Sequence, residues 1–321
     1  MSNSEPRRAR SKGKNRPNRD RTRQEPSDSP AGEQSRFQGL AIVATPIGNA
    51  ADITLRALAT LGAADAILCE DTRVSAKLLA RHGIARPLVA YHEHNAERMR
   101  PRILERLGQG EALALISDAG TPLVSDPGYK LVQAAIAAGI PMTTLPGASA
   151  ALAALTVSGL PTDRFFFAGF LPAKSGERQR ALARLGGVPA TLILFEAANR
   201  LPASLADMAA VLGSRPAAVA RELTKLFEEV RRGDLAELAR HYGEAGPPLG
   251  EVVVVIGPPG EAPPVDDATI DAALAEALRT GSLRDAVEEV AARTGQGRNH
   301  VYARGLALVR RRQEGGDGSQ E

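Results

Sequence analysis

The residues of this chain that are best suited to chemistry gather in five short polar segments, each following an apolar run of strand length. The segments are 45–49 (TPIGN), 70–73 (EDTR), 92–95 (HEHN), 117–122 (SDAGTP) and 146–150 (PGASA). Asp71, Glu70 and Asp118 are candidates to orient a hydroxyl group or to take its proton. Arg73 is a candidate phosphate contact. The Pro and Gly residues of the five segments let a ligand approach the main chain. Together with the charged residues, they predict a small cofactor beside a large anionic substrate.

The stretch 112–128 (ALALISDAGTPLVSDPG) carries the most distinctive pattern. A buried strand is expected over 112–116, followed by a loop with two Asp, two Pro and two Gly and then a helix from Tyr129. Most connections between a strand and a helix have only ~2–6 residues. We therefore interpret the longer, stiff loop as part of a ligand site at the carboxyl end of the strand. An ordinary connection is the alternative.

Several common sites are not indicated. No G-x-G-x-x-G follows the first expected strand and no G-x-x-x-x-G-K-[ST] occurs, which disfavours dinucleotide oxidoreductases and P-loop NTPases. His92 and His94 alternate, so on a strand they would point to opposite faces. The single cysteine, Cys69, can form neither an internal disulfide nor a cysteine-based metal cluster, and we expect it to be a small buried side chain. No metal site is predicted.

Strand and helix patterns alternate five times between residues 37 and 160. This alternation is typical of an α/β fold with a parallel sheet and helices on both faces. Right-handed crossovers would bring all five polar segments to one edge of that sheet. Within this region, Thr54 is expected to cap a helix that stops at Gly62.

The pattern changes after 160–163 (LPTD), which we expect to be a hinge between domains, and it then indicates a mixed α/β arrangement. Strand-like runs lie at 164–171, 190–197, 217–223, 226–231 and 251–256, and helical runs at 177–185, 201–212 and 235–242. A Pro-rich linker then leads to further helical sequence around a turn at 294–297 (TGQG). That arrangement resembles a helix-turn-helix, with a simple helical hairpin as the alternative. We divide the chain into a disordered basic tail (1–36), an N-terminal domain (37–160), a C-terminal domain (161–257), a linker (258–265), a helical segment (266–312) and a second disordered tail (313–321).

The positive charge belongs to the two ends of the chain. Residues 1–36 hold ten Lys or Arg and five Asp or Glu, whereas the whole chain is only +3, so residues 37–321 carry −2. Residues 279–312 hold eight Arg and three acidic residues. Basic ends suit a polyanionic partner such as RNA; a role in solubility alone is the alternative. With neither a membrane-spanning run nor a signal peptide in the sequence, we expect a cytoplasmic protein without membrane association.

The motifs resemble a known family over residues 39–257. VATPIGN, DITLRAL, EDTR, HEHN, SDAGTPLVSDPGY, LPGASA, SGLPTDRFFFAGFLP and ARELTK are similar to the small-subunit ribosomal RNA 2′-O-methyltransferases of the tetrapyrrole-methylase superfamily. The helical segment after the linker also resembles one that these enzymes carry. The resemblance implies a two-domain fold, S-adenosylmethionine (SAM) as methyl donor, and a cytidine 2′-hydroxyl in the decoding region of 16S ribosomal RNA as acceptor. It also implies a homodimer.

The resemblance further implies which residues touch the cofactor. The expected set is Pro46, Ile47, Gly48, Ala119, Gly120, Thr121, Ser149, Ala150, Glu196 and Ala220. One departure lies in the segment 195–200, where Ala198 and Asn199 stand in place of the family's usual Pro-His pair before Arg200. A role of the missing imidazole in RNA contact or as a base is therefore in doubt for this chain, and Asn199 retains only hydrogen bonding.

A ribose 2′-hydroxyl is weakly acidic, so a carboxylate within hydrogen-bond reach would assist methyl transfer. We expect Asp71 or Glu70 to be that carboxylate, with Asp118 behind them; helix capping or RNA orientation is the alternative for the first two. Aromatic residues make up only 3% of the chain, so contacts to RNA phosphates are favoured over base stacking. The candidate RNA contacts are Arg73, Asn199, Arg200, Arg304, Arg310, Arg311 and Arg312.

Two rival functions remain at this point. The first is a SAM-dependent methyltransferase that acts on a small tetrapyrrole, against which the basic ends argue mildly. The second is a DNA-binding regulator that uses the C-terminal helices, which leaves the five polar segments without a role.

Overall fold

The computed structural model describes residues 37–260 and 266–316, with side chains as far as Arg310. The expected tail at 1–36, residues 261–265 of the expected linker, the last five residues and the side chains of Arg311 and Arg312 lie outside the described part.

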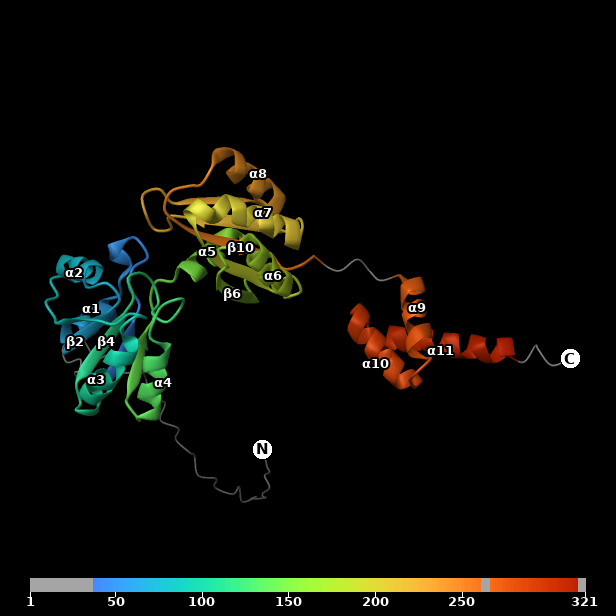
Figure 1. Cartoon of the computed structure of the whole chain (residues 1–321), viewed down its shortest axis with the longest axis horizontal. Helices are drawn as coiled ribbons and strands as arrows, with labels where there is room; N and C mark the ends of the chain where they lie inside the picture. The colour runs from blue at the N-terminus through green and yellow to red at the C-terminus, as the bar shows by residue number, and fades with distance from the viewer. Residues whose placement is uncertain (1–36, 261–265, 317–321) are drawn as a thin grey trace, which may run out of the picture. The chain divides into compact units, whose positions relative to one another are not determined.

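The first sheet is parallel, as the alternation of strand and helix predicted, with the strand order β3-β2-β4-β1-β5. Its strands are β1 (Gly39–Val43), β2 (Ala66–Cys69), β3 (Leu88–Ala90), β4 (Ala112–Ile116) and β5 (Met142–Leu145). The helices that follow the first four strands are α1 (Leu55–Ala63), α2 (Thr72–Arg81), α3 (Ala96–Gly108) and α4 (Tyr129–Ala137). A 3₁₀ turn, η1 (Ala50–Asp52), precedes α1. Figure 1 labels most of these elements.

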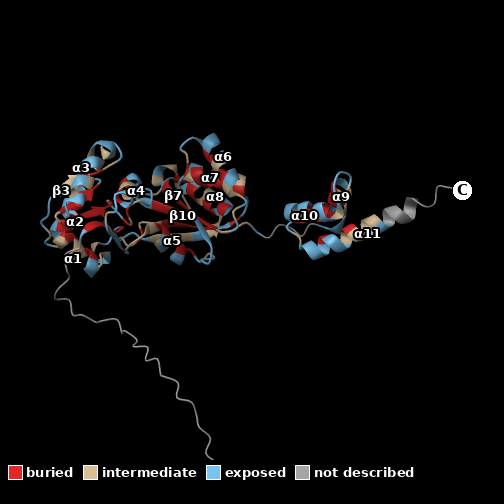
Figure 2. Cartoon of the chain, turned by 90° about the horizontal axis from the view of Figure 1, so that it is seen from below, coloured by how far each residue is buried: buried red, intermediate tan, exposed pale blue. Residues whose placement is uncertain are grey.

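Alternate side chains of β1, β2 and β4 enter two different cores. One core packs Val43 and Ile67 against Leu61 of α1 and Leu79 of α2. The other packs the neighbouring residues of the same strands against Ile103 of α3 and the inner face of α4. The sheet is therefore covered on both faces, and its buried strands stand out in Figure 2.

The second sheet is mixed, with the order β6-β7-β10-β8-β9 and a parallel pairing between β6 and β7. Its strands are β6 (Phe165–Phe170), β7 (Thr191–Ala197), β8 (Pro216–Arg221), β9 (Glu229–Asp234) and β10 (Glu251–Ile256). One face is covered by α6 (Ser175–Leu185), α7 (Leu201–Leu212) and α8 (Leu235–Ala245), which share a core with Leu194 and Val254. The short η2 (Ala198–Arg200) leads into α7.

The opposite face of the second sheet is covered by α5 (Ala150–Ser158). Ala154 and Leu155 of this helix pack against Ile193 and Val255. The helix α5 therefore packs on the second sheet. The chain leaves the first sheet before α5 begins, and so before the domain boundary that was expected at residue 160. No sequence pattern indicates which sheet α5 covers, because this helix is apolar on nearly all sides.

Three local expectations needed correction. Gly62 lies inside α1, which runs on to Ala63, although Thr54 caps the helix as expected. The strand expected at 226–231 begins only at Glu229, because residues 222–228 form a structured loop. The last helix continues to Gly316, beyond the limit expected at Arg312. Cys69 is buried, as expected, and burial raises the pKa of its thiol.

The C-terminal segment consists of α9 (Asp267–Ala277), α10 (Leu283–Thr294) and α11 (Arg298–Gly316). They enclose a small core of their own that includes Leu274, Val290 and Val301. Ser282 caps α10 and Gly295 ends it in a left-handed conformation. Within the described ranges, no helix combines the length and apolar character needed to cross a membrane.

Candidate active site

The strands β1 and β4 lie side by side, yet the helices that follow them, α1 and α4, cover opposite faces of the sheet. Such a switch point opens a crevice at the carboxyl ends of the strands, where open α/β sheets bind ligands. Thr45 and Gly120 join the two strand-end loops by a pair of main-chain hydrogen bonds, with N···O distances of 2.9 and 3.0 Å. The Thr45 hydroxyl donates to the Ser117 carbonyl at 3.0 Å.

A cavity of about 530 Å³ opens at this point, which is within the range of small-molecule sites. One side consists of the loops after β1, β4 and β5, and the other of the strand ends of the second sheet. The cavity is lined by Ile47, Asp118, Ala119, Gly120, Thr121, Val124, Ser125, Asp126, Ser149, Ala150, Phe170, Phe195, Glu196, Ala197, Ala198, Ala220, Leu223, Gly250, Glu251, Val252 and Val253.

The structure gathers eight of the ten expected cofactor contacts around this cavity. They are Ile47, Ala119, Gly120, Thr121, Ser149, Ala150, Glu196 and Ala220. The other two lie outside its lining. Pro46 is buried, and the exposed Gly48 lies so close to Lys225 that an added Cβ would come within 2.5 Å of its Cγ.

The loop after β4 is held in an unusual conformation. Leu123 and Ser125 have φ angles of 74° and 65°, in the left-handed region that non-glycine residues rarely occupy. Gly128 leaves no room for a Cβ, which would lie 2.6 Å from Leu123 Cδ2. The Thr121 hydroxyl donates to the Ala148 carbonyl at 3.1 Å and so ties this loop to the one after β5. Strain of this kind concentrates at functional sites, as the Pro and Gly content of the stretch suggested.

Of the three expected catalytic carboxylates, only Asp118 lines the cavity. Asp71 instead caps α2, where its side chain accepts hydrogen bonds from the Arg73 side chain (2.6 and 3.0 Å) and main chain (2.8 Å). These bonds hold the pKa of Asp71 well below its usual range. The structure thus favours helix capping, the alternative role, for Asp71. Its N–H still donates to Asp118 Oδ1 at 3.2 Å.

Asp126 is a further carboxylate of the cavity that was not among the candidates expected from the sequence. It lines the cavity with Asp118, and burial, with the negative charges of Glu70 and Asp118, raises its pKa to about 6 despite a hydrogen bond with Ser117. A carboxylate with a pKa near the working pH is a better base than one held far below it. The available signal was the second Asp of SDAGTPLVSDPG, eight residues after the first on the same loop.

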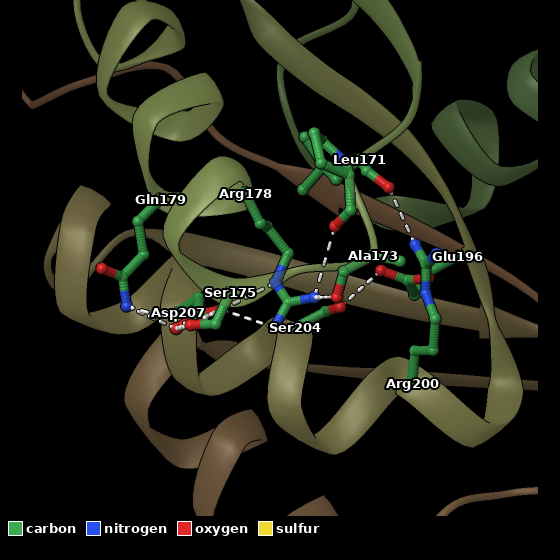
Figure 3. Close-up of polar contacts among 10 residues, drawn as sticks. Leu171, Ala173, Ser175, Arg178, Gln179, Glu196, Arg200, Ser204 and Asp207 are labelled. Atoms are coloured by element: carbon green, nitrogen blue, oxygen red, sulfur yellow. Dashed lines mark hydrogen bonds and ion pairs between the residues drawn. The ribbon is translucent and has the colours of Figure 1, made fainter.

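Glu196 contributes main chain to the cavity and directs its side chain elsewhere. Its carboxylate accepts hydrogen bonds from Arg200 Nε at 2.7 Å and Ser204 Oγ at 2.5 Å. Arg200 Nη2 also donates to the Leu171 carbonyl at 2.9 Å, directly after β6 (Figure 3). Arg200, an expected RNA contact, is therefore occupied in fixing the walls of the cavity. Asn199 is exposed.

A second buried ion pair lies beside this network (Figure 3). Arg178 Nε donates to Asp207 Oδ2 at 2.7 Å, and Arg178 Nη1 donates to the Ala173 carbonyl at 3.0 Å. The two arginines, Arg178 and Arg200, thus anchor the chain that leaves β6 directly after Phe170, a residue of the cavity lining.

The expected RNA contacts outside the cavity have different surroundings. Arg73 is exposed but paired with Asp71. Arg304 makes two hydrogen bonds of 2.7 and 2.6 Å to Asp271 and an ion pair to Asp267, so it joins α11 to α9. Arg304 thus has a structural role, and its contact with RNA stays a prediction. Arg310 is exposed on α11.

Gly120→Val is expected to weaken SAM binding by about tenfold or more, because a β-branched residue is strained at φ +83°. Its Cβ would also lie 3.3 Å from Ile47 Cγ2. Isothermal titration calorimetry measures the effect. Gly110→Val is the matched control, since Gly110 has φ +87°, open space around it and a position before β4 rather than after it. Equal loss of affinity in both variants would contradict a local role for Gly120.

Comparison with known proteins decides the family. The profile of the Tetrapyrrole (Corrin/Porphyrin) Methylases matches residues 39–239, more than half of the chain, and that of the RsmI C-terminal HTH domain matches residues 264–309. The ribosomal RNA small subunit methyltransferase I of Mesorhizobium japonicum is 54% identical over 280 residues, which cover 87% of this chain and 95% of the relative. The chain belongs to the ribosomal RNA small subunit methyltransferase I family of tetrapyrrole methylases. It is therefore a methyltransferase.

Other members of this family are similar over most of their length. The protein of the same name from Erythrobacter litoralis is 52% identical over 84% of this chain and 95% of its own. That from Pseudomonas aeruginosa is 45% identical, over 83% and 96%. The two profile matches confirm the family that the motifs indicated, and the second of them covers the C-terminal helices.

Solved structures agree on the fold. A cobalt precorrin-4 methyltransferase of cobalamin biosynthesis aligns with a TM-score of 0.51 at 19% identity, over 68% of this chain and 94% of its own. A diphthine synthase aligns with a TM-score of 0.53 at 18% identity, over 68% and 89%. These likenesses confirm the tetrapyrrole-methylase fold.

Proposed function

We propose that this methyltransferase transfers the methyl group of SAM to the ribose 2′-hydroxyl of a cytidine in the decoding region of 16S ribosomal RNA. The observation that carries the proposal is the similarity, at 45–54% identity, to relatives named for methylating small-subunit ribosomal RNA. The tetrapyrrole enzymes of the same fold are far more distant, at 19% identity for the precorrin-4 enzyme. A small tetrapyrrole is therefore the less favoured acceptor.

The cavity fits SAM in size and in the character of its walls. Its first-sheet side offers the main chain of Ala119 and Gly120 and the short side chains of Ser149 and Ala150. Its second-sheet side offers Ala220 and Val253, which suit an apolar or flat group. When bound, SAM supplies an electrophilic methyl group on its sulfonium sulfur. The walls of the crevice would hold the ribose oxygen close to that group, at the roughly 3–3.5 Å that such reactions need, and would exclude water.

Asp126 is the proposed general base. Its carboxylate lies at the cavity, and the nearby charges of Asp118 and Glu70 disfavour a further negative charge on it. In this proposal a carboxylate oxygen of Asp126 would accept the 2′-hydroxyl proton. The ribose oxygen would take the methyl group, and the sulfur–carbon bond of SAM would break to leave its demethylated product. Asp118, held by the Asp71 N–H, orients the acceptor. Such proton transfer contributes about 10²–10⁴-fold to a rate.

The acceptor is proposed to be RNA within the small ribosomal subunit in the cytoplasm, bound in part by the C-terminal segment. Deleting residues 266–321 is expected to weaken RNA binding and to flatten its salt dependence, because phosphate contacts release counterions. The milder Arg310→Gln removes one exposed charge, and it should reduce the slope of log K against log salt by roughly 0.7. Filter binding over a series of salt concentrations measures the affinity and its salt dependence for both variants. Unchanged slopes would contradict a contribution of the C-terminal segment to RNA binding.

A homodimer is part of the proposal. The edge strand β6 leaves Phe165 and Phe166 exposed by 46% and 44%, and a second copy of the chain would cover apolar surface and an unpaired strand edge there. Light scattering of the full chain measures the mass in solution.

The proposed activity is tested by mapping 2′-O-methyl groups on 16S ribosomal RNA with and without this protein and SAM. We expect one new methyl group on a cytidine of the decoding region. Labelled transfer to a free tetrapyrrole but not to RNA would support the alternative acceptor. A SAM titration without heat would instead favour a nucleic-acid-binding regulator.

A further inference from the structure

The loop 222–228 between β8 and β9 has a strained backbone. Glu222 and Thr224 have φ angles of 51° and 66°. The left-handed conformation is disfavoured for all residues except glycine, and most of all for a β-branched residue such as threonine. Such residues persist only where the surrounding structure over-determines them, which is typical of functional sites.

Hydrogen bonds from both sides hold this loop. The Glu222 carboxylate accepts from the Glu251 N–H at 3.0 Å and from Lys225 Nζ at 2.8 Å. The Thr224 N–H donates to Glu228 at 2.6 Å, and the Thr224 hydroxyl accepts from the Asn49 N–H at 3.0 Å. The last bond fastens the loop to the turn after β1.

Two glycines allow this close fit. A Cβ on Gly48 would meet Lys225 Cγ at 2.5 Å, and one on Gly250 would meet the Glu222 carboxyl carbon at 2.3 Å. The loop is therefore seated against both neighbours, and its conformation is fixed before any ligand arrives.

The tip of this rigid loop is apolar and open to solvent. Leu226 is 90% exposed and Phe227 is 68% exposed, whereas Leu223, in the same loop, is buried and lines the cavity. The charged groups of the loop are engaged nearby: Lys225 with Glu222 and Glu251, and Glu228 with the Thr224 main chain. The tip thus offers apolar surface next to the cavity rather than charge for a phosphate.

We propose that Phe227, supported by Leu226, is a stacking platform for an unpaired RNA base next to the nucleotide whose ribose enters the cavity. This inference depends on the proposed function, because it assumes an RNA substrate. Single-stranded RNA is recognised largely through bases stacked on aromatic side chains. A ring held on a fixed loop loses little conformational freedom on binding, which favours this use.

The test compares the full-length variants Phe227→Ala, Phe227→Leu and Phe227→Trp with the wild-type chain. Binding of small ribosomal subunits and of a fluorescent single-stranded RNA spanning the methylated position is measured by anisotropy, and SAM affinity by calorimetry. Phe227→Ala is expected to weaken RNA binding by about tenfold, in keeping with the loss of one stacked base, while SAM affinity stays unchanged. Phe227→Trp should restore RNA binding, since the aromatic face is retained.

Ile136→Ala is the matched control, because Ile136 is 61% exposed on α4, far along the chain from this loop. RNA affinity unchanged by Phe227→Ala would overturn the proposal. If Phe227→Leu restored binding as completely as Phe227→Trp, the proposal would also fail, and the tip would be a contact for a protein partner. If Phe227→Ala changed the mass measured by light scattering without loss of RNA affinity, the tip would instead be a contact for a second copy of the chain. Because binding is read without turnover, a wild-type protein that binds RNA but does not methylate it would contradict the proposed function and leave the platform supported.

Discussion

Asp126→Asn is expected to lower the rate of methyl transfer by roughly 10²–10⁴-fold, the usual contribution of a positioned base, and to leave SAM affinity nearly unchanged. Asparagine keeps the shape of the side chain but cannot take the hydroxyl proton. Single-turnover transfer of a labelled methyl group measures the effect. Asp71→Asn is the matched control, because Asp71 lies on the neighbouring strand-end loop but caps α2; it should retain most of its turnover. The reverse order of the two effects would return the role of base to Asp71.

The pH dependence follows from the same residue. The pKa of Asp126 is raised from 3.8 to about 6 by burial and by the charges of Glu70 and Asp118, so below that pH the carboxyl group is protonated and cannot act as a base. The wild-type kcat/KM is therefore expected to fall about tenfold for each pH unit below 6 and to level off above it. A profile that stays flat down to pH 5 would exclude Asp126 as the base.

The stability of the fold should depend on pH in the opposite direction from the rate: protonation of Asp126 lowers the rate but stabilises the folded state. A carboxyl group whose pKa is raised on folding favours the folded state when it is protonated, so its contribution is lost as the pH rises from about 4 through 6. Asp126→Asn removes this penalty and is expected to raise the melting temperature at pH 7–8. The difference should vanish near pH 4. An inactive variant that is also less stable at neutral pH would mean that the fold, rather than the proton transfer, was damaged.

Asp207→Ala is expected to destabilise the protein by about 3–5 kcal/mol, because it leaves the Arg178 guanidinium buried without its partner. The two side chains are only 11% and 4% exposed. Burial alone would raise the pKa of Asp207, but hydrogen bonds from Gln179, Ser175 and Arg178 outweigh it and lower the pKa. The free energy of unfolding from urea titration, followed by circular dichroism, measures the loss.

Two controls separate this effect from ordinary surface changes. Glu177→Ala removes the exposed pair with Lys174 on the same helix, where the N···O distance is 3.8 Å, and should cost less than about 1 kcal/mol. Replacing both partners, with Arg178→Met and Asp207→Leu, should recover much of the stability. A small loss in Asp207→Ala, comparable to that of Glu177→Ala, would contradict the structural importance of the buried pair.

The first sheet could be predicted from the sequence because its signals are local. The apolar runs before TPIGN, EDTR and SDAGTP are short and separated by helical patterns, so their parallel pairing and shared edge follow from the usual right-handed connections. The loop 222–228 was missed for the opposite reason. Leu226 and Phe227 have the composition of a strand, whereas the bonds that hold their loop outside the sheet include long-range ones to Asn49 and Glu251.

The candidate site divides in the same way. The resemblance supplied the small residues around the cavity, but residue types could not rank the carboxylates. Asp71 and Asp126 are both aspartates in loops that follow strands, so the sequence alone does not distinguish them. Their pKa values shift in opposite directions, because Asp71 pairs with Arg73 at the start of a helix while Asp126 is partly buried near two further acidic residues. Arg304 likewise lies in an Arg-rich stretch that suggests RNA contacts, whereas its pairing with Asp271 depends on how α9 and α11 pack together.

The central claim is that the methyl donor binds at the switch point between β1 and β4 against the strand ends of the second sheet. The most direct measurement is a crystal structure of the full chain with SAM or its demethylated product. The account predicts density for the ligand in contact with Gly120, Ala150 and Val253. A ligand bound elsewhere, with this cavity left vacant, would contradict it.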